Sequence, residues 1–79
     1  MEIGRRYLIR YRSDTQRFER EAVMDYLGEG QAGVDAENYL FNARPLAGTQ
    51  AMPKRWVQSV TEVPKSSPIV IERRAAGPR

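Results

Sequence analysis

Alternation of apolar and polar residues is the clearest pattern in the chain. Over residues 5–12, Tyr7, Ile9 and Tyr11 share one parity, and the opposite parity carries mainly arginine. A period of two is typical of a strand with one buried face and one solvated face. A serine and an aspartate come next, and both favour turns. The pattern therefore predicts a strand over residues 5–12 with a cationic outer face.

Further short strand patterns follow, separated by turn-forming residues. The predicted strands cover residues 38–43, 49–52, 57–63 and 69–71, the last as an edge strand. Between them lie a proline- and glycine-containing turn at 44–48, a single turn at 53–56 and a break at 64–68. Five or six short strands with turn signals about every 8 to 12 residues predict a small antiparallel barrel. Such a barrel hides its own sheet edges.

Residues 15–27 fit two different elements. Phe18, Ala22 and Tyr26 fall at helical spacing, and Gly28 supplies a stop for such a helix. As a long bent strand, the same segment would pair with residues 5–12, with Arg20 as the one discordant member of its apolar face. Local propensity favours the helix, but tertiary context can override it.

The rest of the chain sets the limits of the domain. Residues 28–35 carry three glycines and two acidic residues, which predicts an exposed loop. Residues 73–79 are too small and polar to pack, which predicts a disordered tail. With 79 residues, the chain has room for one domain, expected over residues 1–72.

Composition narrows the chemistry. The chain has neither cysteine nor histidine, so thiolate and imidazole metal sites and the usual general base are missing. We therefore expect no enzyme activity, no cofactor and no metal. No apolar run approaches the roughly 20 residues of a membrane span, and the first residues do not resemble a secretory signal. These features favour a cytoplasmic protein.

The second half of the chain resembles the end of an SH3-like barrel. The run from Tyr39 to Arg44, the glycine turn and the segment Pro53-Lys54-Arg55-Trp56-Val57 match its strand, hairpin, short turn and last strand. Residues 5–63 also resemble the WYL domain, a Sm-like and SH3-like module of bacterial transcription regulators. Asn38 stands where that family has its tryptophan. The resemblance implies an SH3-like (Sm-like) barrel in which residues 15–27 form the bent second strand, and it implies a role in transcription regulation.

Basic and aromatic residues supply the candidate binding site. Cations at even spacing on a strand face can follow successive phosphates, and exposed rings can stack on bases. The candidate phosphate ligands are Arg6, Arg10, Arg12, Arg44, Lys54 and Arg55, and the candidate stacking residues are Trp56 and Tyr39. Two alternatives stay open: Glu19 and Glu21 on a paired strand would neutralise the arginines, and Trp56 would plug a barrel end.

These residues and their pattern favour two functions. The first is a non-enzymatic barrel that binds nucleic acid or regulates a nucleic-acid-associated complex. The second is a module for protein interaction or self-assembly, whose exposed edge at residues 69–71 adds a strand to a partner.

Overall fold

Strands make up nearly all the regular structure of this chain. The computed structural model describes residues 1–30 and 36–75. The elements are β1 (Arg6–Tyr11), β2 (Arg20–Glu29), β3 (Asn38–Asn42), β4 (Thr49–Pro53), the 3-10 helix η1 (Lys54–Trp56), β5 (Val57–Glu62) and β6 (Val70–Arg74). The predicted all-β class is confirmed. Within the described ranges, no helix is long and apolar enough to span a bilayer.

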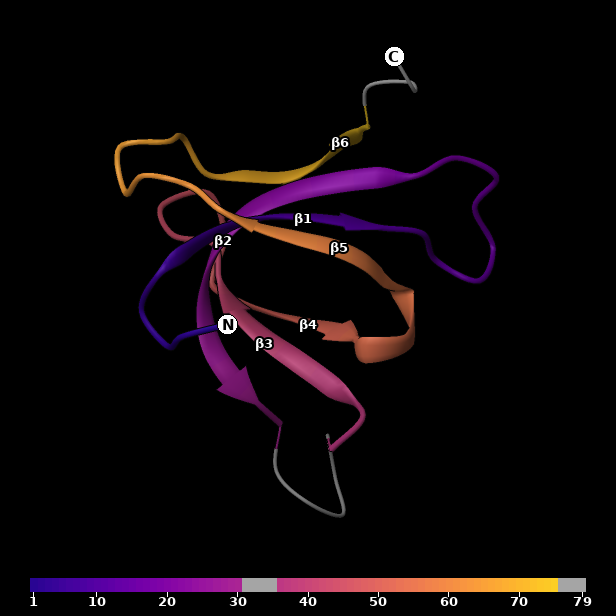
Figure 1. Cartoon of the computed structure of the whole chain (residues 1–79), viewed down its shortest axis with the longest axis horizontal. Coiled ribbons are helices and arrows are strands. Elements are labelled where there is room, and N and C mark those ends of the chain that lie inside the picture. Colours follow the sequence, from indigo (N-terminus) through magenta and orange to yellow (C-terminus); the bar gives the residue numbers. More distant parts are fainter. Residues whose placement is uncertain (31–35, 76–79) are drawn as a thin grey trace.

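The strands form one curved antiparallel sheet. Its order is β4-β3-β2-β1-β5, and β6 pairs with β2 outside this path. The first half of β2 lies between β1 and β6, whereas its second half pairs with β3. β2 is strongly bent along its length, as Figure 1 shows, and this bend curves the sheet around the core residues. The fold is barrel-like, but backbone pairing does not close it, because β4 and β5 end the path without pairing to each other.

Residues 20–27 form a strand because β2 has pairing partners along its length. The helical alternative for residues 15–27 is wrong: β2 begins at Arg20, and residues 15–19 contain no helix. The register places Leu8 opposite Val23 and Ile9 opposite Ala22. A helix here would form its own backbone hydrogen bonds, but the backbone groups of β1 and β6 that now pair with β2 would have no partner. Tertiary pairing therefore overrides local propensity.

The predicted parity of β1 places its apolar residues in the core. Tyr7, Ile9 and Tyr11 are buried there. They pack with Ala43, just after β3, and with inward residues of the other strands, namely Ala22, Met24, Tyr26, Phe41 and Met52. The inward-facing residues of these strands thus form a single core.

The end of β2 depends on a glycine. The pairing of β2 with β3 shifts between Tyr26 and Gly28, and Gly28 adopts a φ of 120°. Residues with a Cβ rarely adopt this conformation. An added Cβ would also lie 3.4 Å from Cδ1 of Ile3. Gly28 and Glu29 belong to β2 rather than to the predicted loop, of which residues 31–35 lie outside the described ranges.

The domain extends beyond its predicted end at residue 72. Strand β6 runs through Arg74, and Arg73 and Arg74 face Glu21 and Arg20 of β2. The backbone N–H of Ala75 also donates to the carbonyl of Glu19 at 3.0 Å. The disordered tail was predicted to begin at residue 73, but β6 runs through Arg74. The strand continues because its pairing with β2 extends past its apolar residues. Residues 76–79 lie outside the described ranges.

Candidate functional site

Arg6, the first predicted phosphate ligand, is bound to other groups of the protein. Its guanidinium donates two hydrogen bonds to the carboxylate of Asp25, at 2.8 and 3.2 Å, and others to the carbonyls of Lys65 and Ser67. Only 16% of the Arg6 side chain and 15% of the Asp25 side chain are exposed. The hydrogen bond from Arg6 is the main cause that lowers the pKa of Asp25. Arg6 therefore has a structural role at this position.

Arg10 faces the acidic residues that the sequence suggested as its alternative partners. Its guanidinium lies 3.7 Å from the carboxylate of Glu21, directly opposite on β2, and 3.9 Å from that of Glu19. Glu21 also accepts a hydrogen bond of 2.9 Å from Arg73 of β6. The outer face of β1 is therefore partly neutralised by cross-strand ion pairs, as the alternative predicted.

The basic residues of η1 are paired as well. Lys54 binds the carboxylate of Glu29, which raises the pKa of Lys54. Arg55 donates a hydrogen bond of 2.7 Å to Asp14 and lowers the pKa of that carboxyl. These exposed pairs hold η1 against β2 and the β1–β2 loop but contribute little stability.

Five arginines make no ion pair with any other described residue: Arg12, Arg17, Arg20, Arg44 and Arg74. Arg44 lies apart from the others, at the β3–β4 turn, beside a groove that also includes Arg6 and Leu46. The other four lie in the β1–β2 loop, at the start of β2 or at the end of β6. We call Arg12, Arg17, Arg20 and Arg74 the arginine cluster. Unpaired positive charge thus gathers at one end of the sheet.

Two members of the arginine cluster continue the inward face of the sheet. Tyr11 lies opposite Arg20, and Arg20 lies opposite Arg74. Residues directly opposite each other in antiparallel strands share a face, so all three project from the face that forms the core. The Nε atom of Arg20 is buried without a hydrogen-bond partner, and the Arg74 guanidinium lies 3.8 Å from the centre of the Phe18 ring.

Sequence reasoning missed Arg17, Arg20 and Arg74 as site residues. A signal was present for Arg20, because it breaks the apolar parity that Ala22 and Met24 continue. A charged residue at an inward position belongs at an open end of a barrel, where its head can reach solvent. No such signal existed for Arg74, since its position depends on the pairing of β6 with β2.

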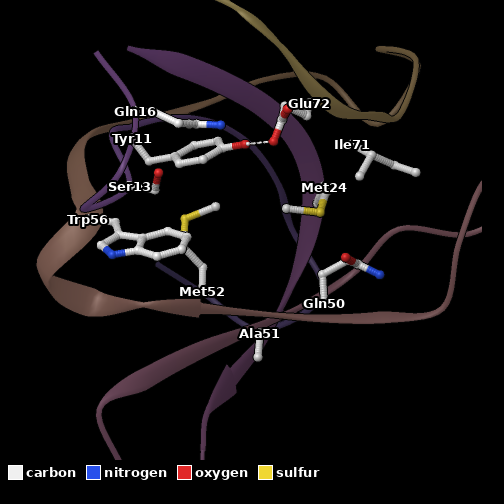
Figure 2. A pocket seen from close by; sticks show the side chains of 10 residues that line it. All are labelled: Tyr11, Ser13, Gln16, Met24, Gln50, Ala51, Met52, Trp56, Ile71 and Glu72. Carbon is white, nitrogen blue, oxygen red and sulfur yellow. Dashed lines mark hydrogen bonds between the residues drawn. The ribbon is translucent and has the colours of Figure 1, made fainter. Parts of the chain in front are cut away.

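A cavity of about 240 Å³ opens beside Tyr11 in the space between β4 and β6. Figure 2 shows Tyr11, Trp56 and Met52 on one side of it, and Met24, Gln50 and Ile71 on the other. The remaining lining residues are Ser13, Gln16, Ala51 and Glu72. The cavity therefore occupies the opening that the unclosed sheet leaves.

Aromatic rings form one wall of the cavity. The ring planes of Tyr11 and Trp56 are nearly parallel, at 13°, with 6.3 Å between their centres. In Figure 2 the six-membered ring of Trp56 is directed toward Met52 and its nitrogen points away from the cavity. Trp56 is half-buried, so it closes part of the barrel end and still presents a ring surface there.

Tyr39, the other predicted stacking residue, belongs to a different group. Its ring packs against Tyr26 and Phe41, with centres 6.1 and 6.4 Å away, and the Lys54 ammonium lies 5.5 Å from its centre. The structure brings Trp56 to the cavity and leaves Tyr39 outside it.

The polar lining of the cavity combines the Glu72 carboxylate, which only accepts hydrogen bonds, with hydroxyl and amide groups that can both donate and accept. The Tyr11 hydroxyl donates to the Glu72 carboxylate at 3.2 Å, and Oε1 of Gln16 is buried with no hydrogen-bond partner. Burial, followed by the charge of Glu72, raises the pKa of Tyr11 to about 12. Tyr11 is therefore a neutral donor at neutral pH. No cluster of metal-ligating residues occurs among residues 1–30 and 36–75.

Comparison with known proteins gives no family for this chain, so its resemblance to the WYL domain stays a prediction. No protein-family model, curated protein or solved structure matches the sequence or the fold.

Proposed function

We propose that the protein is a non-enzymatic module that binds nucleic acid in the cytoplasm through the arginine cluster. The observation that carries this proposal is the clustering, beside an aromatic-walled cavity, of four arginines that make no ion pair with another described residue. Arginine side chains without internal carboxylate partners can bind phosphate oxygens. This contact releases counterions that are condensed on the nucleic acid, and their release favours binding of the protein. A role in a transcription-regulating complex follows only if the resemblance to the WYL domain holds.

This proposal relocates the predicted binding site. Arg12 and Trp56 remain in it, whereas Arg6 and Lys54 are bound to acidic partners. Arg10 and Arg55 lie at the same end of the sheet but also face carboxylates. Arg44 lies by the other end of β1, near Arg6.

Salt-dependent binding tests the proposal directly. Four phosphate contacts predict that log affinity for a single strand falls with log salt at a slope near −3, at about −0.7 per contact. The double variant Arg12→Gln/Arg17→Gln should make that slope shallower by about 1 to 2 units. Both side chains are exposed, so the fold should be retained.

A matched control removes the same charge elsewhere. Arg5 and Lys65 are exposed and lie away from the arginine cluster, before β1 and in the β5–β6 turn. Arg5→Gln/Lys65→Gln should leave the slope unchanged. Absence of salt-dependent binding to single-stranded and duplex DNA and RNA would contradict the proposal, as would equal effects of the two double variants.

The strand edge of β6 supports a second candidate function. In the described part of the chain, β6 pairs with β2 and with no other strand, and it carries the exposed Ile71. An extended segment of a protein partner could add to this free edge. Loss of a dimer or of a bound partner in a Val70→Asp variant that remains folded would support this candidate, whereas a monomer without any partner would count against it.

A further inference from the structure

We infer that the cavity between β4 and β6 binds one unstacked base that bears an exocyclic amino group, such as adenine or cytosine. This inference rests on the proposed function and adds two kinds of selectivity to it. The protein would prefer single strands to duplexes, and it would prefer amino-bearing bases to thymine or uracil.

The size of the cavity suits one flat group. Its volume of about 240 Å³ is below the roughly 300 to 1,000 Å³ of pockets that hold drug-sized ligands. Met24 and Met52 give it a flexible apolar lining that can adapt to a ring. A paired base in a duplex cannot enter such a space, whereas a base in a single strand can turn outward.

The aromatic wall provides a surface for stacking. Tyr11 and Trp56 present nearly parallel rings to the same cavity. Stacking of a base on an aromatic ring accepts any base, because every base has a π face. This wall therefore explains affinity for unpaired bases but gives no preference among them.

The preference comes from the acceptors. Glu72 supplies a carboxylate with capacity beyond the bond from Tyr11. The amide nitrogen of Gln50 donates to the carbonyl of Thr49, which leaves its oxygen as a further acceptor. The amino groups of adenine and cytosine donate hydrogen bonds, and thymine and uracil have no such group. A carbonyl of thymine placed beside Glu72 would meet a carboxylate, which cannot donate a hydrogen bond to it.

The arginine cluster distinguishes a nucleotide from other flat ligands. Arg20 and Arg74 continue from Tyr11 along the inward face, so positive charge lies next to the aromatic wall. A base attached to a phosphate satisfies both features together. A cationic peptide side chain could also use Glu72, but it would be repelled by this cluster.

Trp56 is the only tryptophan of the chain, so its fluorescence reports on the cavity. We would titrate the protein with single strands of oligo-dC, oligo-dA and oligo-dT of about eight nucleotides, within the site sizes known for single-strand binders, and with a duplex. The expected result is quenching of Trp56 by oligo-dC and oligo-dA, with affinity about tenfold higher than for oligo-dT, since one hydrogen bond to a charged acceptor has that effect. The duplex should bind more weakly and leave the emission unchanged.

Glu72→Gln tests the acceptor, and Glu62→Gln is its matched control. Glu72→Gln should reduce the preference for oligo-dC over oligo-dT to about twofold or less, while Glu62→Gln on β5 should preserve it. Titration with dCMP identifies the source of the ligand: quenching by dCMP alone supports a free nucleotide, and quenching by the oligonucleotide alone supports a nucleic acid strand.

The outcomes separate this inference from the proposed function. Equal salt-dependent affinity for the duplex and all single strands, with unchanged emission, would overturn the base site and leave phosphate binding in place. A preserved preference for oligo-dC in Glu72→Gln would overturn the role of the acceptors. Quenching by a lysine-containing peptide but by no nucleotide would overturn the base site in favour of a protein partner. Absence of all nucleic acid binding would overturn both proposals.

Discussion

Arg6 and Asp25 show how an outward-facing ion pair contributes to a small domain. The pair is mostly buried, and Lys65 approaches Asp25 to 3.1 Å. The lowered pKa means that folded Asp25 keeps its charge at pH values where the unfolded chain takes up protons. This stabilisation is complete above the unfolded pKa of about 3.9 and is lost as the pH falls through the folded pKa.

Asp25→Asn should therefore destabilise the protein more at pH 7 than near pH 3. The expected loss at pH 7 is about 1 to 3 kcal/mol, because Arg6 stays partly buried without its charged partner. Urea unfolding at both pH values measures it. Glu2→Gln, at a residue whose side chain is 71% exposed, should change stability by no more than about 0.5 kcal/mol. An equal loss at both pH values would show that the charge of Asp25 is not the cause.

Residue spacing predicts which side chains point outward, but it does not predict which of them remain free of internal partners and so can bind a ligand. The parity of β1 placed Arg6 and Arg10 outside the core, and the acidic residues of β2 suggested partners for Arg10. Nothing local indicated that the β5–β6 turn would supply carbonyls to Arg6. The neighbours that neutralise a charged side chain are brought to it by the strand topology. Whether that side chain can bind a ligand therefore depends on the fold and not on local spacing.

At the scale of elements, β6 is attached more firmly than its polar sequence suggests. Arg73 pairs with Glu21, which is only 8% exposed, and Arg74 packs on Phe18. The sequence predicted a strand here from three β-branched residues, but it could not predict that pairing with β2 carries the arginines into the sheet.

Truncation after Glu72 should consequently lower the melting temperature. The truncation removes Arg73, which pairs with Glu21, and it removes the backbone hydrogen bond from Ala75 to Glu19. A cost of about 1 to 3 kcal/mol is expected, and each kcal/mol lowers the melting temperature of a domain of this size by roughly 4 to 8 °C. Truncation after Ala75 keeps β6 whole and should have little effect. Equal melting temperatures for the two truncated chains would show that the end of β6 does not contribute.

At the scale of the whole molecule, a single core supports the fold. Phe41 is fully buried, and its ring centre lies 5.8 Å from that of Tyr26. A chain of this length has a total stability of roughly 4 to 12 kcal/mol, at about 0.05 to 0.15 kcal/mol per residue. One large core side chain therefore provides a substantial part of it.

Phe41→Ala should cost about 3 to 5 kcal/mol through lost burial and a residual cavity. Thermal unfolding followed by circular dichroism should show a fall of more than about 12 °C, or a chain already unfolded at room temperature. Leu46→Ala, at a site that is 61% exposed, should shift the transition by only a few degrees at most. A mild effect of Phe41→Ala would mean that the core repacks around the gap.

The fold was more predictable than the site. Alternation over residues 5–12 and 38–43 identified β1 and β3, and the barrel-like class followed from the number of short strands. The cavity could not be predicted, because its walls come from β4, β6 and the β1–β2 loop, which meet only in three dimensions. The position of Trp56 at a turn before a strand indicated a place at the end of the barrel, and its role as a stacking residue stays a prediction.

The position of β1 in the sheet determines the order in which the protein can fold. Tyr7 pairs with Met24 on one side and with Glu62 on the other, so the first strand receives its second partner only from the last third of the chain. During synthesis on the ribosome, the edge of β1 that faces away from β2 therefore has no partner until β5 has left the exit tunnel. Contacts between such distant parts of a chain form slowly, on a scale of about milliseconds to seconds. Until β5 pairs with β1, this edge of β1 stays open to unwanted pairing with other strands.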